Sequence, residues 1–95
     1  MSDDATEWIA RIVVTRDTPA LADRLAQTLL PESAREVPRA RAVIARRGER
    51  AVEITVRARD TGALRAAVNT FLGWVALVSN TERVADAPPG PEALI

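Results

Sequence analysis

The sequence predicts an α+β fold, a two-layer sandwich in which a three-stranded antiparallel sheet carries two helices on one face, in the order β-α-β-β-α. Three observations support this prediction. The run from Glu7 to Arg16 and the two runs that flank Gly48 are rich in β-branched residues, as strands are. The stretches that begin at Pro19 and Asp60 repeat apolar residues every three or four positions, as helices do. A chain of 95 residues accommodates these elements in one small domain.

The composition narrows the range of functions. The chain has no cysteine and no histidine, which excludes thiol nucleophiles, disulfides, metal sites of the Cys/His kind and imidazole acid–base catalysis. We therefore expect no catalytic residue, no metal and no cofactor in this protein, and no enzymatic activity. No basic segment leads into an apolar one at the N-terminus, which predicts a cytoplasmic protein. The formal net charge is zero, yet residues 35–59 contain eight arginines against three glutamates, so positive charge is concentrated there.

The first predicted element is a strand from Glu7 to Arg16, which follows an acidic start that we expect to be frayed. The run is β-branched and aromatic, and it is too short for a helix between these flanks. Its more apolar face consists of Trp8, Ala10, Ile12 and Val14. Arg11 and Thr15 point to the other side of the sheet, because successive side chains of a strand alternate between its faces.

A helix is predicted from Pro19 to about Leu30. Thr18 can cap its first turn, and proline suits the first helical position, where its missing N–H costs nothing. One face is apolar and consists of Leu21, Ala22, Leu25, Ala26 and Leu29, while Asp23, Arg24 and Gln27 lie on the opposite one. Pro31 should end the helix because its ring disfavours helical geometry at Leu30, and a polar loop from Glu32 to Pro38 should follow.

Two further strands, Arg39–Arg47 and Ala51–Arg59, flank a turn in which Gly48 supplies the positive backbone angle of a hairpin. The second strand alternates strictly, with Val52, Ile54, Val56 and Ala58 inward and Glu53, Thr55, Arg57 and Arg59 outward. In the first strand Ala40, Ala42 and Ile44 fit the inner face, with Arg41, Val43, Ala45 and Arg47 outside. The pattern leaves the register of that strand open by one residue.

The stretch from Asp60 to Val78 predicts the helix around which the chain is organised. Asp60 or Thr61 can cap its first turn. The predicted core stripe consists of Leu64, Val68, Phe71, Leu72 and Val75. The polar residues from Ser79 to Ala87 can extend the helix by a turn or two. Residues 1–86 then form the domain, and residues 87–95, which contain three prolines, form a flexible tail.

The other side of this helix lacks the charges of an ordinary surface helix, since Arg65 is the only charged residue between Asp60 and Glu82. A helix that is apolar nearly all round is buried on both sides. In so small a domain we expect the second cover to come from another chain, although Trp74 and Leu77 could instead fold over the edge of the chain's own core. The residues assigned to a partner are Ala63, Ala66, Thr70, Gly73, Trp74 and Leu77. We predict no membrane span, because the apolar run is shorter than the ~20 residues that one needs.

Two segments resemble a known family. Asp60 is followed by Leu64, Arg65, Ala66 and Asn69, which resembles the signature of the Pcc or LAGE family, the small dimerisation subunit of the KEOPS complex. The Leu-Leu-Pro-Glu segment that ends at Glu32 is similar to that family's Leu-x-Pro-Glu segment. The resemblance implies a non-catalytic subunit of the complex that places threonylcarbamoyl on an adenosine beside the anticodon of tRNA. It also implies a homodimer, or a heterodimer with a paralogue, whose two helices dock the catalytic threonylcarbamoyl-transferase subunit.

Outward arginines form a second candidate surface, which would meet tRNA phosphates within the complex. The residues are Arg41, Arg47, Arg57 and Arg59, with Arg65 on the main helix. A solvated face or a dimer surface explains them equally well. An alternative function is an autonomous RNA-binding module that uses this Arg-rich sheet face; a small ligand-sensing dimer also fits the topology but has no recognisable pocket residues. Base stacking is not predicted, because the chain has no tyrosine and Phe71 belongs to the core stripe.

Overall fold

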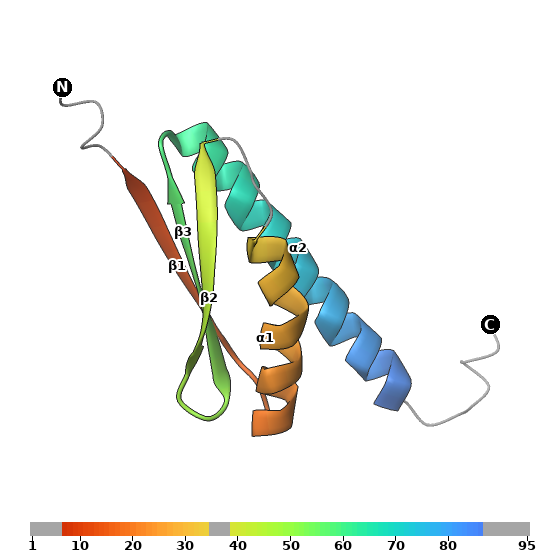
Figure 1. Ribbon diagram of the computed structural model, residues 1–95. Coiled ribbons are helices and arrows are strands. Elements are labelled where there is room, and N and C mark those ends of the chain that lie inside the picture. Colours follow the sequence, from red (N-terminus) through yellow and green to blue (C-terminus); the bar gives the residue numbers. More distant parts are fainter. Residues whose placement is uncertain (1–6, 35–38, 87–95) are drawn as a thin grey trace, which may run out of the picture.

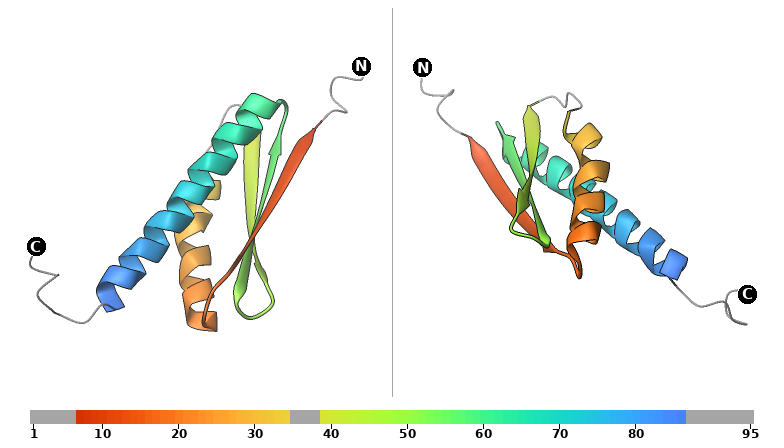
Figure 2. Two further views of the ribbon diagram at one scale, coloured as in Figure 1. Left: turned by 180° about the vertical axis from the view of Figure 1, so that it is seen from behind. Right: turned by 60° about the horizontal axis from the view of Figure 1, so that its bottom comes forward.

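The computed structural model describes residues 7–34 and 39–86, and it has the predicted order β-α-β-β-α (Figure 1). The elements are β1 (Trp8–Thr15), α1 (Pro19–Ser33), β2 (Ala40–Arg47), β3 (Ala51–Ala58) and α2 (Thr61–Asp86). Both helices lie on the same face of the sheet, so the fold has two layers (Figure 2). The predicted frayed start, part of the predicted loop and the predicted tail at residues 87–95 lie outside the described residues.

The sheet is antiparallel throughout, with β3 in the centre between β1 and β2. Ile12 of β1 and Ile44 of β2 both lie opposite Ile54 of β3, which confirms the inner face that was predicted for each strand and settles the register of β2. The turn between β2 and β3 contains Gly48 at a φ of 71°, as a hairpin glycine requires. Alternating burial along the central strand makes the inner face of the sheet the floor of the core.

The core is formed by this inner face, by α1 and by the first half of α2. Its buried side chains are Ala22, Leu25, Ala26 and Leu29 of α1, Val52, Ile54 and Val56 of β3, and Ala67 and Phe71 of α2. The predicted caps are present at both helix starts. The amide of Leu21 donates to Thr18 Oγ1 at 3.1 Å, and the amide of Ala63 donates to Asp60 Oδ1 at 2.7 Å. Of the two residues that could cap α2, Asp60 is therefore the one that does.

The predicted end of α1 is wrong: the helix continues through Pro31 to Ser33, so Glu32 is helical and not part of a loop. Proline removes a single backbone donor, and only the last turn of the helix follows it. Two hydrogen bonds hold this last turn: the hydroxyl of Ser33 and the amide of Ala34 donate to the carbonyl of Leu30 at 2.8 and 3.3 Å. The cost of the proline is thereby limited to one hydrogen bond near a helix end.

An ion pair that the sequence analysis did not predict fixes the second half of α2 to the end of β1. The guanidinium of Arg16 donates to the carboxylate of Glu82, and it also donates to Ser79 Oγ at 2.7 Å. The two charged side chains are only 12% and 10% exposed. Their pairing is therefore largely shielded from water, and α2 is held at a second place beyond its contact with the core.

Candidate functional site

The burial of α2 differs from the predicted stripe. Phe71 is buried as predicted, but Leu72 is 44% exposed, and Ala67, which the predicted stripe does not include, is 8% exposed. The helix is thus rotated so that Ala67 and Phe71 face the sheet, and the small alanine lets the helix approach the strands closely. On either side of Ala67 and Phe71, several side chains of α2 are only partly buried against the core. They are Leu64, Val68, Trp74, Val75 and Val78.

Four of the six residues assigned to a partner are exposed, and these are Ala66, Thr70, Gly73 and Leu77. Leu77 is 54% exposed, the highest value among the large apolar side chains that the structure describes on α2. At Gly73 a side chain would meet no atom within 4 Å, so nothing inside this chain requires a glycine there. Ala63 and Trp74 are half-buried. Trp74 packs against the core, so the alternative that it folds over the edge of the chain's own core is partly correct for this residue.

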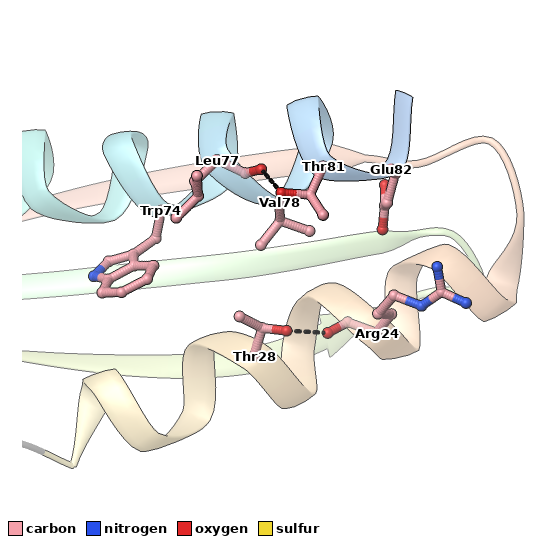
Figure 3. Close-up of a pocket in the computed structure, with 7 residues that line it drawn as sticks. All are labelled: Arg24, Thr28, Trp74, Leu77, Val78, Thr81 and Glu82. Carbon is pink, nitrogen blue, oxygen red and sulfur yellow. Dashed lines mark hydrogen bonds between the residues drawn. The ribbon is translucent and has the colours of Figure 1, made fainter. Parts of the chain in front are cut away.

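A groove of about 270 Å³ separates the two helices. It is lined by Arg24 and Thr28 of α1 and by Trp74, Leu77, Val78, Thr81 and Glu82 of α2 (Figure 3). The hydroxyl of Thr28 donates to the carbonyl of Arg24 at 2.9 Å, and that of Thr81 to the carbonyl of Leu77 at 2.8 Å. Because both hydroxyls are bonded within their own helices, the middle of the groove offers an apolar surface.

The outer face of the sheet also exposes apolar side chains. Ile9, Val13 and Val43 are 47%, 48% and 56% exposed. They stand among arginines: Ile9 lies opposite Arg57 on one side of β3, and Arg41 lies opposite Arg57 on the other. This face is therefore a mixture of apolar and basic side chains, which is a composition common in protein interfaces.

The predicted RNA-contacting arginines do not share one surface. Arg41, Arg47 and Arg57 lie on the outer face of the sheet, and Arg59 follows β3, whereas Arg65 is exposed on α2 in the helix layer. Acidic residues already pair with some of these arginines. Arg47 lies 3.0 Å from Glu53 and Arg57 lies 3.3 Å from Glu7.

Arg11, the other outward arginine of β1, lies 3.8 Å from the Glu53 carboxylate that also pairs with Arg47. In the described part of the chain no ion pair reaches Arg41 or Arg59. Among the predicted RNA-contacting arginines on the sheet side, these two side chains therefore have no acidic partner in the described residues.

The residues of the family signature divide between the core and the surface. Leu64 is partly buried against the core, whereas Arg65, Ala66 and Asn69 are exposed on α2. No hydrogen bond or ion pair within residues 7–34 and 39–86 involves the side chain of Arg65 or Asn69. The signature therefore contains surface positions that the fold of the described residues does not need.

Asp60 forms a small polar cluster at the start of α2. The hydrogen bond from the Ala63 amide is the largest effect and lowers the pKa of this carboxyl. Desolvation opposes it, and the charge and hydrogen bond of Arg39 lower the pKa further. Arg39 Nε lies 2.7 Å from Asp60 Oδ2. Arg39 has a φ of 68°, unusual for a residue with a side chain, and its carbonyl accepts from the amide of Arg59 at 2.9 Å. The cluster fixes the entry into α2.

By length and composition alone, residues Thr61–Glu82 of α2 could cross a membrane. A single helix of this kind is weak support for a span, because helices of soluble proteins pass the same test. Here the helix carries part of the core: insertion into a bilayer would remove Phe71 from the sheet and would separate Glu82 from Arg16. Insertion of this helix into a bilayer would therefore disrupt the packing that the structure describes.

The chain matches a protein-family model and resembles chains of known structure. The family model described as "Transcription factor Pcc1" matches residues 9–82 of the chain. Among solved structures, the chain resembles one from the "Crystal structure of binary complex Gon7-Pcc1", with a TM-score of 0.73 and 13% sequence identity over 83% of this chain and 96% of that one. At this identity the likeness concerns the fold. No curated protein matches the chain.

Proposed function

Because the chain belongs to the Pcc1 family, we propose that it is a non-catalytic scaffold subunit of the KEOPS complex, as the signature on α2 implies. The family match begins at the second residue of β1 and covers α1, β2, β3 and α2 as far as Glu82. The similar solved chain is itself part of a complex with a second protein, which fits a subunit that acts by holding other chains. Within the described residues no group of three or more acidic side chains could hold a metal.

The exposed side of α2 docks the catalytic threonylcarbamoyl-transferase subunit. The observation that carries this proposal is the 54% exposure of Leu77 beside the open surface of Gly73, on a helix with no charge between Arg65 and Glu82. A charge-free surface of small residues lets a partner helix approach closely, and Leu77 and Trp74 offer large apolar anchors. Nothing in the described part of the chain covers this side.

Self-association through the outer face of the sheet is the second part of the proposal. Ile9, Val13 and Val43 expose about half of their surface on this face, and a small domain gains stability when such side chains are covered. The helices lie on the opposite face of the sheet. A dimer formed in this way leaves both docking surfaces accessible, so two catalytic subunits could bind one dimer.

Contact with tRNA is proposed only within the assembled complex. Arg41 and Arg59 are the sheet-side arginines without an ion pair in the described residues, whereas Arg47 and Arg57 are already neutralised by glutamates. Two separated charges would bind RNA too weakly for an autonomous RNA-binding module, because the affinity for phosphates grows with the number of basic contacts. The module therefore remains the second candidate function.

The name of the family raises the question of DNA binding. A helix-turn-helix motif needs two consecutive helices joined by a short turn. In the described residues α1 and α2 are separated by the whole β2–β3 hairpin, and each packs one side on the sheet. The fold thus provides no support for a transcription-factor mechanism of that type, and the scaffold role is the one that we propose.

Co-expression with the threonylcarbamoyl-transferase subunit from the same source tests this function. Affinity capture followed by light-scattering mass measurement should give a complex that contains two copies of this chain and one or two copies of the catalytic subunit. The free chain should sediment as a dimer at micromolar concentration. Absence of any co-purifying catalytic subunit would overturn the docking proposal, and a monomeric free chain would overturn the dimer.

A further inference from the structure

The two ends of the groove between α1 and α2 differ in chemistry. Trp74 lies at one end, and the side chains of Arg24 and Glu82 lie together at the other (Figure 3). Between them the lining is apolar apart from threonine hydroxyls that are already bonded. A groove with one aromatic end and one charged end distinguishes the two directions in which an elongated ligand could lie.

Arg24 has no ion pair in the described part of the chain, unlike Arg16 and Arg46. Arg16 pairs with Glu82, and Arg46 pairs with Asp23, the residue that precedes Arg24. The acid next to Arg24 in the sequence is therefore already engaged. Arg24 is exposed and lines the groove, so its charge is available to a ligand that enters there.

Glu82 has one carboxylate oxygen to spare. Its Oε1 accepts from Arg16, but its Oε2 is buried and has no hydrogen-bond partner among the described residues, and the Nε of Arg16 is likewise buried without an acceptor there. The residue as a whole is only 9% exposed and lines the groove. A buried acceptor without a donor is costly and uncommon in folded proteins. A donor that enters the groove from outside would remove this defect.

We propose that Arg24 and Glu82 are the specificity-determining contacts for the helix that docks in this groove. Arg24 pairs with an acidic side chain of that helix, and Glu82 Oε2 accepts a hydrogen bond from a donor close to that acid. The occupant is an amphipathic helix of the catalytic subunit, so the inference rests on the proposed function and adds to it the direction and register of docking. Its apolar stripe covers Trp74, Leu77 and Val78.

The lining residues favour a helix as the ligand. Arg24 and Thr28 on one wall, and Trp74 and Val78 on the other, are each separated by one helical turn. Such rows accept the ridge of a third helix. A second copy of this chain is a poorer occupant, because its α2 has no acidic residue between Arg65 and Glu82 that could meet Arg24. Complementary charge therefore points to a different protein.

Titration of the purified catalytic subunit with variants of this chain tests the inference. Arg24→Glu should weaken binding about a hundredfold, because it sets two acids against each other, while Arg24→Lys should stay within a few-fold of the native chain. Raising the salt concentration should weaken the native complex more than the Arg24→Gln complex.

A second variant addresses the carboxylate. Glu82→Gln, in a preparation that a thermal melt shows to be folded, should weaken binding about tenfold, because the amide must satisfy both Arg16 and the partner with one oxygen. Should this variant fail to fold, the Arg24 series decides the inference without it.

The outcomes separate the two proposals. Tight binding by the native chain and by Arg24→Glu alike would overturn the inference and leave the proposed function in place. No binding by the native chain would overturn both. If Arg24→Glu instead changes only the self-association of the free chain, measured by sedimentation, the occupant is a second copy and the inference is wrong.

Discussion

The two helices lie on the same face of one sheet, yet they are buried to different degrees. α1 has four buried core residues, Ala22, Leu25, Ala26 and Leu29, and its opposite side carries mostly polar residues, with Leu30 near its end 49% exposed. α2 is longer and more apolar, but among its large side chains Leu72 and Leu77 are 44% and 54% exposed. The sheet is wide enough to cover the apolar side of α1, but it covers only one side of α2. The difference indicates that the sheet covers most of the apolar surface of α1, whereas α2 keeps a large apolar side for the interface that we propose.

The largest expected effect follows from this difference in burial. Leu25→Ala should lower the free energy of unfolding by about 2 to 5 kcal/mol, because the side chain is fully buried. Leu77→Ala makes the same substitution on α2 and should cost less than about 1 kcal/mol in the free chain. Denaturant unfolding of both variants measures the two values. Equal losses would mean that Leu77 is covered in the free protein, and the contrast between the helices would not hold.

A somewhat smaller effect is expected where α2 is held to β1. Arg16→Met should destabilise the chain by about 3 kcal/mol, because it leaves the Glu82 carboxylate buried without its cation. Combining it with Glu82→Leu should recover much of the loss, since no charge then remains buried. Thermal unfolding of the single and double variants compares them. A double variant that is less stable than the single one would show that the pair contributes more than its burial costs.

The smallest effect concerns the start of α2. The lowered pKa of Asp60 means that its ionised form stabilises the fold at neutral pH and that this stabilisation is lost as the pH falls through the folded-state value, below about 4. Asp60→Asn keeps an oxygen for the cap but does not titrate there. The native chain should therefore have a higher melting temperature than Asp60→Asn at pH 6, and this difference should shrink toward about pH 2. A gap that does not change with pH would assign the effect of Asp60 to its shape and not to its charge.

Local signals predicted most of the fold. The alternation of β3, the cap at Thr18 and the turn at Gly48 each depend on neighbours in the sequence, and the structure confirms all three. Leu72 was wrongly placed in the core because the rotation of a helix on a sheet is set by packing, and there the small Ala67 allows a closer approach. The end of α1 was predicted too early because hydrogen bonds from Ser33 and Ala34, which follow Pro31, close the last turn of the helix.

The candidate site was harder to predict from the sequence. The exposed side of α2 was recognised from its lack of charge, and Ala66, Gly73 and Leu77 are indeed exposed. The polar end of the groove depends on Arg16 and Glu82, which are 66 residues apart. No periodic pattern joins residues so distant, and only the fold brings them together.

A binding measurement with a matched pair of α2 variants tests most directly the claim that this helix serves an interface. Ala66 and Ala76 are both exposed, but Ala76 lies on the side of α2 away from the groove. Ala66→Glu should abolish capture of the catalytic subunit and leave the melting temperature of the free chain nearly unchanged, whereas Ala76→Glu should retain both. If Ala66→Glu unfolds the free chain, or if it captures the catalytic subunit as well as Ala76→Glu does, the assignment of this side of α2 to a docked partner is wrong.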